Sequence, residues 1–331
     1  MTSANTQRAT LAPDRETVAD AIEIASRAPS LHNTQPWRWV FDGTRLQLYG
    51  DTDRQLFATD PHGREWMISC GVVLHHACTV FAALGWHTEV TRLPDRDRPD
   101  LIATIGFEPW PDPPAAILAR AGAIEHRYSD RLPMSEPTGW AAVAPALRAL
   151  TMLHDVAFEV IAPEARPRVV AASGQAAKAR GYDMMYRDEL DWWTGHTDIS
   201  EGVPESALPS SAEVARVDIA RDFPRAPHSA RRAEMTDHAQ LVLLGTTDET
   251  PSRWLRTGEA LSAVLLECTV RGLATCALTH ITELPAARRT LADLLPHRTL
   301  PQVLIRIGTT PEDDRPSATP RRPIADILTF R

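Results

Sequence analysis

Residues 28–37 read Ala-Pro-Ser-Leu-His-Asn-Thr-Gln-Pro-Trp, a loop-forming stretch between a predicted helix and a predicted strand. Asp14 is placed to cap the helix, whose apolar residues recur at helical spacing: Val18, Ala21, Ile22 and Ala25. Pro29 ends this helix because its ring fixes φ and it has no N–H to donate. Trp37 begins the strand, which is expected to reach Phe41. The polar side chains between them are therefore expected on a loop at a helix end, where they can form hydrogen bonds.

The chain after this loop is predicted to complete a first structural unit. Its further elements are a turn at 42–43, a strand at 45–49, an apolar helix at about 65–84, strands near 88–92 and 101–107, and a proline-rich linker at 109–114. The unit therefore contains both helices and short strands.

Much of this unit occurs a second time. In one block, four positions match at a constant offset: Gly71 with Gly258, Leu74 with Leu261, Gly85 with Gly272, and Thr88 with Thr275. In a second block, four more match at another constant offset: Pro99 with Pro301, Ile105 with Ile307, Gly106 with Gly308, and Pro109 with Pro311. Because neither block needs a gap, we interpret the chain as two diverged copies of one unit, at residues 14–112 and 115–331.

The second copy contains an insertion. A helix-rich stretch at about 163–190 and an irregular stretch at 191–227 have no counterpart in the first copy. Loops of this length are often functional lids, so a lid is expected at about residues 181–230. Its aromatic and methionine residues fit either a lid that fills a substrate cavity or a hydrophobic staple: Tyr182, Met184, Met185, Tyr186, Trp192 and Trp193.

Residues 28–37 resemble the A-P-S-x-x-N-x-Q-P-W signature of flavin-dependent nitroreductases. Hydroxyl and amide groups in such a loop can bond the polar edge and ribityl chain of FMN. The resemblance implies that the cofactor is bound by Pro29, Ser30, His32, Asn33 and Gln35. The less favoured alternative for this stretch, taken alone, is a turn that ends a helix and contains a satisfied asparagine.

Residues 127–131, Arg-Tyr-Ser-Asp-Arg, resemble the R-x-S-x-R element with which the same family holds the FMN phosphate. Alternation along an extended segment places Arg127, Ser129 and Arg131 on one side. Two guanidinium groups and a hydroxyl suit a phosphate dianion, because charge-assisted hydrogen bonds are strong. Without the other motifs, a solvated basic loop would be the simpler interpretation.

Two later segments complete the resemblance. Ile307-Gly308 followed by Pro320-Arg321-Arg322-Pro323 is similar to the family's terminal strand and its basic residue at the phosphate. Residues 272–280 resemble the G-L-G-T-C-W-I-G-like strand beside flavin N5 and O4, which implies contacts from Ala277, Leu278, Thr279 and His280. Ala274 and Ala277 replace the family's second glycine and its aromatic, so the backbone N–H that faces N5 is left open.

Each copy keeps only the half-site that the other lacks. Residues 149–154 stand where 28–33 would fall, and Thr6, Arg8 and Thr10 stand where the 127–131 arginines and serine would fall. Nitroreductases are typically homodimers in which each FMN contacts both subunits. The resemblance, which is to the Acg-like subgroup, therefore implies an α+β nitroreductase-like fold of two fused repeats with an inserted lid and one FMN.

Composition and charge exclude several classes of protein. A formal net charge of -8 and a pI near 5.8 argue against binding nucleic acid or anionic lipid by bulk electrostatics. Four cysteines without a C-x-x-C pair suggest neither a disulfide scaffold nor a metal site. The N-terminus resembles no signal peptide, and we see no stretch approaching the roughly 20 apolar residues that span a bilayer, so the protein is expected in the cytoplasm.

Three functions remain open from the sequence. The first is an FMN-dependent oxidoreductase that takes hydride from NAD(P)H and reduces a small-molecule electron acceptor, such as a nitroaromatic or a quinone. The second is a protein that stores FMN beneath the lid, and the third is an enzyme for one metabolite. Hydride transfer requires no side-chain acid or base, so none is assigned, and Cys276 and His280 are expected to pack or to line the site. A further homodimer is compatible with all three.

Overall fold

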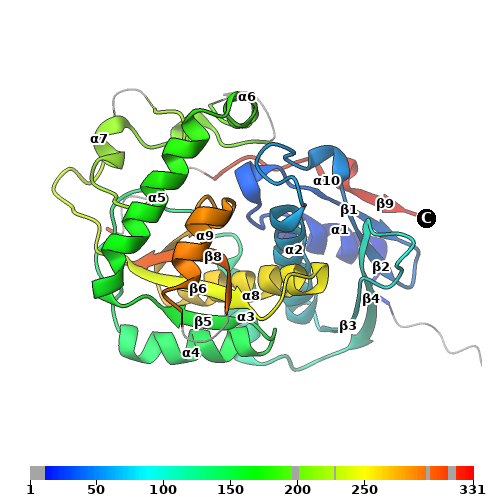
Figure 1. Ribbon diagram of the computed structural model, residues 1–331. Coiled ribbons are helices and arrows are strands. Elements are labelled where there is room, and N and C mark those ends of the chain that lie inside the picture. Colours follow the sequence, from blue (N-terminus) through cyan, green and yellow to red (C-terminus); the bar gives the residue numbers. More distant parts are fainter. Residues whose placement is uncertain (1–11, 196–200, 227–228, 296–298, 312–317) are drawn as a thin grey trace, which may run out of the picture.

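The computed structural model describes residues 12–195, 201–226, 229–295, 299–311 and 318–331. Within these ranges the protein is a mixed helix and sheet structure with two separate sheets (Figure 1). Thr6, Arg8 and Thr10, which the sequence places opposite the basic segment of the second copy, lie outside the described residues.

The helices and strands begin and end close to the predicted residues. Asp14 caps the first helix by accepting a hydrogen bond from the Thr17 N–H at 2.8 Å. The helices are α1 Arg15–Ala25, α2 Arg64–Ala83, α3 Ala115–Ala123, α4 Trp140–Met152, α5 Arg166–Gly181, α6 Met184–Trp192, α7 Ser211–Val214, α8 Pro251–Val270, α9 Pro285–Ala292 and α10 Ile324–Ile327. The strands are β1 Trp37–Phe41, β2 Leu46–Gly50, β3 Trp86–Arg92, β4 Leu101–Pro109, β5 Ala157–Val160, β6 Gln240–Thr246, β7 Ala274–Leu278, β8 Leu300–Gly308 and β9 Leu328–Phe330. Short 3-10 helices cover Leu31–Asn33, Thr52–Arg54, Pro163–Ala165 and Glu205–Ala207.

The two sheets share one strand order. The first sheet runs β3-β4-β2-β1-β9, and the second, read from its β7 edge, runs β7-β8-β6-β5. Neighbouring strands are antiparallel except that β9 pairs with β1 in parallel. The C-terminal strand therefore crosses from the second half of the chain to the sheet of the first.

The connection between the first two strands distinguishes the two halves. A turn joins β1 to β2, in which the Asp42 carboxylate accepts hydrogen bonds from the Thr44 and Arg45 N–H groups. In the second sheet, the connection from β5 to β6 is residues 161–239, which contain α5, α6 and α7. We call residues 161–239 the inserted segment.

Helices α2 and α8 lie between the two sheets and form the centre of the core (Figure 1). Both have 20 residues, and their bounds differ by the same offset that relates Gly71 to Gly258. Each helix is followed by a glycine with positive φ, Gly85 at 84° and Gly272 at 70°, from which the chain enters a strand. The first repeated block is thus present in the structure as two matching helix-to-strand units.

Helix α2 corrects one expectation from the sequence. By length and composition it could cross a membrane, although we expected no such stretch. In the structure, 78% of its apolar window is buried inside the protein, as in the core helix of a folded domain. The long apolar run is therefore used for packing against α8.

The second repeated block is shifted by two residues in the structure. Thr88 pairs with Phe107, whereas its counterpart Thr275 pairs with Ile307. Strand pairing therefore makes Phe107 the position equivalent to Ile307, and the sequence match of Ile105 with Ile307 is wrong by two positions. A shift of two leaves every side chain on its original face, because side chains alternate with a period of two.

Candidate functional site

Two adjoining cavities lie where the two halves of the chain meet. One, the basic cavity, is lined by arginines and hydroxyl groups, among them Arg27, Ser30, Arg127, Ser129, Arg131 and Arg321. The other, the apolar cavity, is lined largely by aliphatic side chains, among them Ile68, Val72, Leu261, Ala277, Leu278 and Val303. Six residues line both cavities, which we together call the cleft: Pro29, Ser30, His32, Ser129, Arg131 and Pro209.

The loop after α1 reaches the cleft in an unusual backbone conformation. His32, Asn33 and Gln35 have φ values of 50°, 56° and 49°, in the left-handed region that few side chains adopt. Local hydrogen bonds hold this conformation, since the Ser30 hydroxyl accepts from the Gln35 N–H at 2.9 Å. Strain of this kind persists only where the surroundings fix it, and it is often found at functional sites.

The structure places the five loop residues in different roles. Pro29, Ser30, His32 and Asn33 line the cleft, but the Asn33 side-chain amide donates to two protein carbonyls, those of Gly202 at 2.8 Å and Pro320 at 3.1 Å. Gln35 is fully buried and does not line the cleft. Its carbonyl Oε1 accepts from the Arg322 N–H at 2.8 Å, which fixes the loop against the C-terminal segment.

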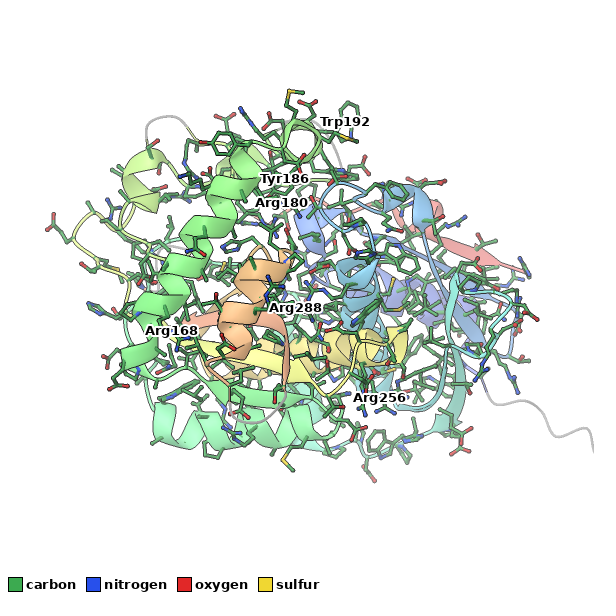
Figure 2. All side chains as sticks on the ribbon, viewed as in Figure 1. Arg168, Arg180, Tyr186, Trp192, Arg256 and Arg288 are labelled. Carbon is green, nitrogen blue, oxygen red and sulfur yellow. The ribbon has the colours of Figure 1, made fainter. Side chains whose placement is uncertain are left out.

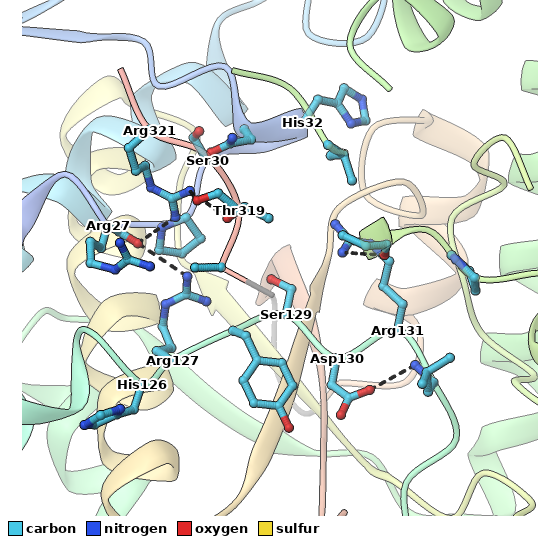
Figure 3. A pocket seen from close by; sticks show the side chains of 18 of the residues that line it. Arg27, Ser30, His32, His126, Arg127, Ser129, Asp130, Arg131, Thr319 and Arg321 are labelled. Carbon is cyan, nitrogen blue, oxygen red and sulfur yellow. Dashed lines mark hydrogen bonds between the residues drawn. The ribbon is translucent and has the colours of Figure 1, made fainter. Parts of the chain in front are cut away.

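Residues 127–131 lie along the edge of β7. Ser129 forms a bridge with Thr275, and the Asp130 N–H donates to the Thr275 carbonyl at 2.8 Å. The Asp130 carboxylate is paired with Arg232 at 2.9 Å, and no ion pair joins it to its neighbour Arg131 among the described residues. Figure 3 shows Arg127, Ser129 and Arg131 around the cavity opposite Ser30 and Arg321.

Four arginines of the basic cavity lack an acidic partner in the described part of the chain, whereas Arg231 and Arg232, which also line it, pair with Glu213 and Asp130. Among the described residues, Arg27, Arg127, Arg131 and Arg321 form no ion pair with a carboxylate, whereas the fully buried Arg306 is paired with Asp237. Arg127 and Arg321 both donate to the Arg27 carbonyl, at 3.4 and 2.9 Å (Figure 3).

The pKa values of these arginines reflect the same crowding. Burial, together with the neighbouring arginines, lowers the pKa of Arg127 to about 10 and that of Arg321 to about 9. Burial also lowers the pKa of Arg131. Clustered guanidinium groups repel one another, and an anion between them would relieve that repulsion.

Arg321 and Arg322 have different surroundings. Arg321 lines the basic cavity, where its guanidinium also contacts Thr319 at 2.6 Å. Arg322 lies outside the cleft and donates to the carbonyls of Gln35 at 3.1 Å and Trp37 at 3.3 Å. Arg322 therefore positions the loop and does not line the site. The sequence alone could not show which of two adjacent arginines faces the cavity.

Strand β7 and the residues after it lie beside the apolar cavity, and three of the four residues predicted there line it. Ala277, Leu278 and Thr279 line the cavity together with Cys276, whose thiol pKa is raised by burial. His280 does not line the cleft, because its ring turns away and its Nε2 lies 2.8 Å from the Ser173 hydroxyl.

The inserted segment contributes residues to the lining of the cleft that the sequence did not single out. Phe223 contacts the His32 ring edge-on at 5.7 Å, and the Arg131 guanidinium lies 5.2 Å from the Phe223 ring. Arg221 forms a buried ion pair with Glu283 and donates to the Thr279 hydroxyl at 2.9 Å. The prolines around Phe223 were the only feature of the sequence that pointed to this part of the segment. Nothing in the sequence pointed to Arg27, which lines the basic cavity.

Most of the aromatic and methionine residues, for which a cavity-filling lid and a hydrophobic staple were both open, face solvent. Four of them are 69 to 80% exposed, Tyr182, Met184, Met185 and Trp192. Figure 2 shows Trp192 at the outer surface beside α6. Tyr186 is buried, but its hydroxyl accepts from Arg221 at 2.9 Å and does not line the cleft. The cavity-filling interpretation is therefore wrong for these four residues, because the sequence of a nine-residue helix that mixes apolar and charged residues does not reveal what its apolar side chains contact.

Comparisons with known proteins place the chain in a family. No family model matches it. A Mycobacterium tuberculosis protein named "Putative NAD(P)H nitroreductase acg" is 44% identical over 318 residues, which cover 96% of each chain. The chain belongs to the Acg-like group of the nitroreductase superfamily.

Other relatives agree with this assignment. A second M. tuberculosis protein, also named a putative NAD(P)H nitroreductase, is 39% identical over 327 residues, 96% of this chain and 92% of the relative. A crystal structure of a putative nitroreductase from Anabaena variabilis covers 91% of this chain and 90% of its own, with a TM-score of 0.50 and 10% identity. The predicted nitroreductase-like α+β fold is thereby confirmed over nearly the whole chain.

Proposed function

We propose that the chain binds one FMN in the cleft and uses it as an oxidoreductase. The observation that carries this proposal is a group of arginines without carboxylate partners at one end of an apolar slot. In this proposal Arg127, Ser129, Arg131 and Arg321 hold the phosphate in the basic cavity. The ring system lies in the apolar cavity beside the backbone of residues 277–279. The arginine donors and their uncompensated charge fit a phosphate dianion.

Polar groups near the middle of the cleft suit the ribityl chain and the polar edge of the ring. Both ring nitrogens of His32 are buried without a hydrogen-bond partner in the described part of the chain. Burial and nearby Arg221 hold the pKa of His32 well below its ordinary value, so the ring is neutral at physiological pH. A neutral imidazole has one donor and one acceptor, and FMN carries partners for both. Ser30 lines both cavities and adds a hydroxyl.

We infer that the chain is a fusion of two repeats. Such a fusion has two equivalent positions for a cofactor, and only one of them leaves room for it. The offset between α2 and α8 makes Glu259 the counterpart of Val72, and Arg92 the counterpart of Thr279. Val72 and Thr279 line the apolar cavity. At the equivalent place, Arg92 donates to Glu259 through two hydrogen bonds of 2.9 and 2.7 Å, and Glu259 is buried.

The loop of the second repeat is replaced as well. Helix α4 continues to Met152 and is followed within five residues by β5, where the first repeat has its left-handed loop. A charged pair thus fills the equivalent ring site, and no matching loop closes it. This supports one FMN per chain.

FMN supplies the redox chemistry when it is bound, accepting hydride and passing electrons on. The chain's own residues bind its phosphate, orient its ring against β7 and, through Phe223 and Pro209, exclude water from the apolar cavity. The relatives' names favour NAD(P)H as the electron donor. Nitro or quinone compounds as acceptors, a cytoplasmic location and a further homodimer stay predictions.

The inserted segment favours a second candidate function, the storage of FMN. It is bonded to both halves of the chain: Gly202 accepts from Asn33, Glu189 accepts from the Ala58 and Thr59 N–H groups, and Arg221 pairs with Glu283. Because these bonds hold the segment to both halves of the chain, a nicotinamide would have to displace Phe223 to stack on the ring. A lid that does not open would leave a bound but unreactive cofactor.

One experiment separates the two functions. The purified, flavin-loaded protein is mixed anaerobically with NADH or NADPH, and the visible flavin absorbance is followed. An oxidoreductase loses the absorbance within seconds. Persistent absorbance that dithionite removes would instead support storage. A protein that binds no FMN under any condition would contradict both.

A further inference from the structure

A buried ion pair of Arg232 with Asp130 lies in the wall of the basic cavity, although neither residue is among the proposed phosphate ligands. Both residues line the cavity, and both side chains are 2% exposed. The Arg232 guanidinium donates to the two carboxylate oxygens at 3.1 and 2.9 Å, and to the Pro133 carbonyl at 2.8 Å. A bidentate pair of this kind fixes the position and the orientation of the carboxylate.

Asp130 belongs to the segment that is proposed to hold the phosphate. Ser129 precedes it and Arg131 follows it. Because side chains alternate along an extended segment, Asp130 points to the opposite side from its two neighbours. Figure 3 shows its carboxylate turned away from the Ser129 hydroxyl and the Arg131 guanidinium. A negative charge is thus held one residue away from two groups that a phosphate dianion would contact.

This carboxylate would compete with the phosphate if Arg232 did not hold it. Burial lowers the pKa of Arg131, and the negative charge of Asp130 is among the influences that oppose this shift, so the two side chains lie within electrostatic range. Within the described part of the chain, Asp130 pairs with Arg232 and not with Arg131. A buried carboxylate that loses its partner is strongly destabilising. Arg131 is the adjacent cation to which such a carboxylate would turn.

Arg232 stands near the end of the inserted segment in a conformation that costs free energy. Its φ is 53°, in the left-handed region that bulky side chains rarely adopt. Such strain persists only where the surrounding contacts hold it. Further along, the Met134 N–H donates to the Asp237 carboxylate at 3.0 Å, and the His238 N–H donates to the Met134 carbonyl at 2.7 Å. The end of the inserted segment is therefore fastened along residues 130–134.

We propose that Arg232 is a positioning residue for the cofactor phosphate. It neutralises the Asp130 carboxylate and holds it away from Arg131, which leaves the phosphate-binding groups free for the cofactor. This inference rests on the proposed binding of FMN in the cleft and adds a residue of the inserted segment to that site. Affinity for the phosphate therefore depends on the end of the inserted segment staying in place against residues 130–134.

The test compares two flavins that differ only in the phosphate. FMN and riboflavin are titrated into full-length, flavin-free protein, and binding is followed by flavin fluorescence. Arg232→Gln removes the cation that holds Asp130. We expect the Kd for FMN to rise about tenfold or more and the Kd for riboflavin to change less than about twofold, because a nearby carboxylate repels only the phosphate. A loss of packing alone would weaken both flavins.

A second substitution tests whether the charge of Asp130 is responsible. In the double variant Asp130→Asn with Arg232→Gln the competing charge is absent, and the asparagine oxygen can still accept from the Leu132 N–H, as Asp130 does at 3.0 Å. The Kd for FMN should return to within about threefold of wild type, since a buried ion pair can be replaced by neutral groups. Asp130→Asn alone should bind FMN at least as tightly as wild type. If Arg232→Gln does not fold, weaker FMN binding by Asp130→Asn would overturn the inference.

Arg225→Gln is the matched control. Arg225 belongs to the same inserted segment and pairs with the Asp222 carboxylate, but it is exposed and does not line the cleft. Exposed ion pairs contribute little, so this variant should bind both flavins as wild type does.

Failure of this inference and failure of the proposed function give different results. If wild type binds FMN no more tightly than riboflavin, the basic cavity is not the phosphate site and the proposed function fails. If wild type prefers FMN but Arg232→Gln keeps that preference, or weakens both flavins without rescue by Asp130→Asn, Arg232 has only a structural role. A preference for FMN that is lost in Arg232→Gln and restored in the double variant supports the positioning role.

Discussion

Gly71 and Gly258 meet across the interface of α2 and α8 in a reciprocal contact. A β-carbon on Gly71 would lie 2.0 Å from the Leu255 carbonyl oxygen, and one on Gly258 would lie 2.0 Å from the Ile68 carbonyl oxygen. Ile68 and Leu255 each precede the neighbouring glycine by three residues. Equivalent atoms therefore touch in both directions, as at the twofold axis of a symmetric dimer. This contact supports the proposal that one chain contains both halves of a dimer-like unit.

Replacing Gly71 by alanine should destabilise the protein. The added methyl group meets backbone atoms that cannot rotate away, so the two helices must separate at the centre of the core. Overpacking of this kind typically costs about 1–3 kcal/mol. The free energy of unfolding, measured in urea, should fall by that amount or more. Gly174→Ala is the matched control, since nothing lies within 4 Å of that position in α5, and it should stabilise by roughly 0.5–1 kcal/mol.

Removing Arg127 or Arg321 should weaken FMN binding. Each alanine variant loses a charge-assisted hydrogen bond to the phosphate, worth about 1.5–3 kcal/mol. Titration followed by flavin fluorescence should show a Kd raised about tenfold to a hundredfold. Arg131→Ala should behave in the same way. Arg168→Ala, at an exposed position of α5, should leave the Kd unchanged. Equal affinity in all four variants would tell against the phosphate assignment.

Glu259→Gln should lower the stability of the protein without changing its affinity for FMN. The change breaks the ion pair with Arg92 and leaves partly buried polar groups unsatisfied, at a cost of roughly 1–3 kcal/mol. Because this pair occupies the closed counterpart of the ring site, the affinity for FMN should not change. Absorbance titration of wild type and variant should saturate at one equivalent of FMN. Saturation of the wild-type protein at two equivalents would overturn the single-site proposal.

The ion pair of Arg221 with Glu283 should make stability depend on acid pH. Burial opposes ionisation of Glu283, but Arg221 outweighs it and the pKa falls from 4.5 to about 2. A lowered carboxyl pKa contributes stability above pH 4.5 that is lost as the pH falls towards about 2. Breaking a buried pair costs roughly 3–5 kcal/mol, so Glu283→Gln should unfold at lower urea concentration at pH 7.

The pH profile supplies the control for that prediction. The difference between wild type and Glu283→Gln should shrink as the pH is lowered from 4.5 towards about 2. Glu283 is protonated first in the unfolded chain, and near pH 2 it becomes uncharged in the folded protein as well, like the glutamine. Glu164→Gln, at an exposed position, should match wild type throughout. A difference that stays constant down to pH 2 would mean that Glu283 acts through packing alone.

The repeat shows where sequence comparison works and where it fails. The helix-to-strand block was found correctly because its glycines stand at a close helix contact and at left-handed turns, positions that tolerate little else. The strand block was matched two residues out of register. Buried strands rich in aliphatic residues look alike after a shift of two, and only the pairing with β3 and β7 fixes the register.

The sequence by itself determined the elements, the basic segment and the loop motif, because capping, hydrophobic period and clustered arginines act within short stretches of chain. The tertiary structure decided the rest. It turned Gln35, Arg322 and His280 away from the cleft, brought Phe223 over it, and left Met184 and Met185 in solvent. Those outcomes depend on contacts between segments that are far apart in the sequence. The local sequence around a residue does not show which distant segment will lie opposite it.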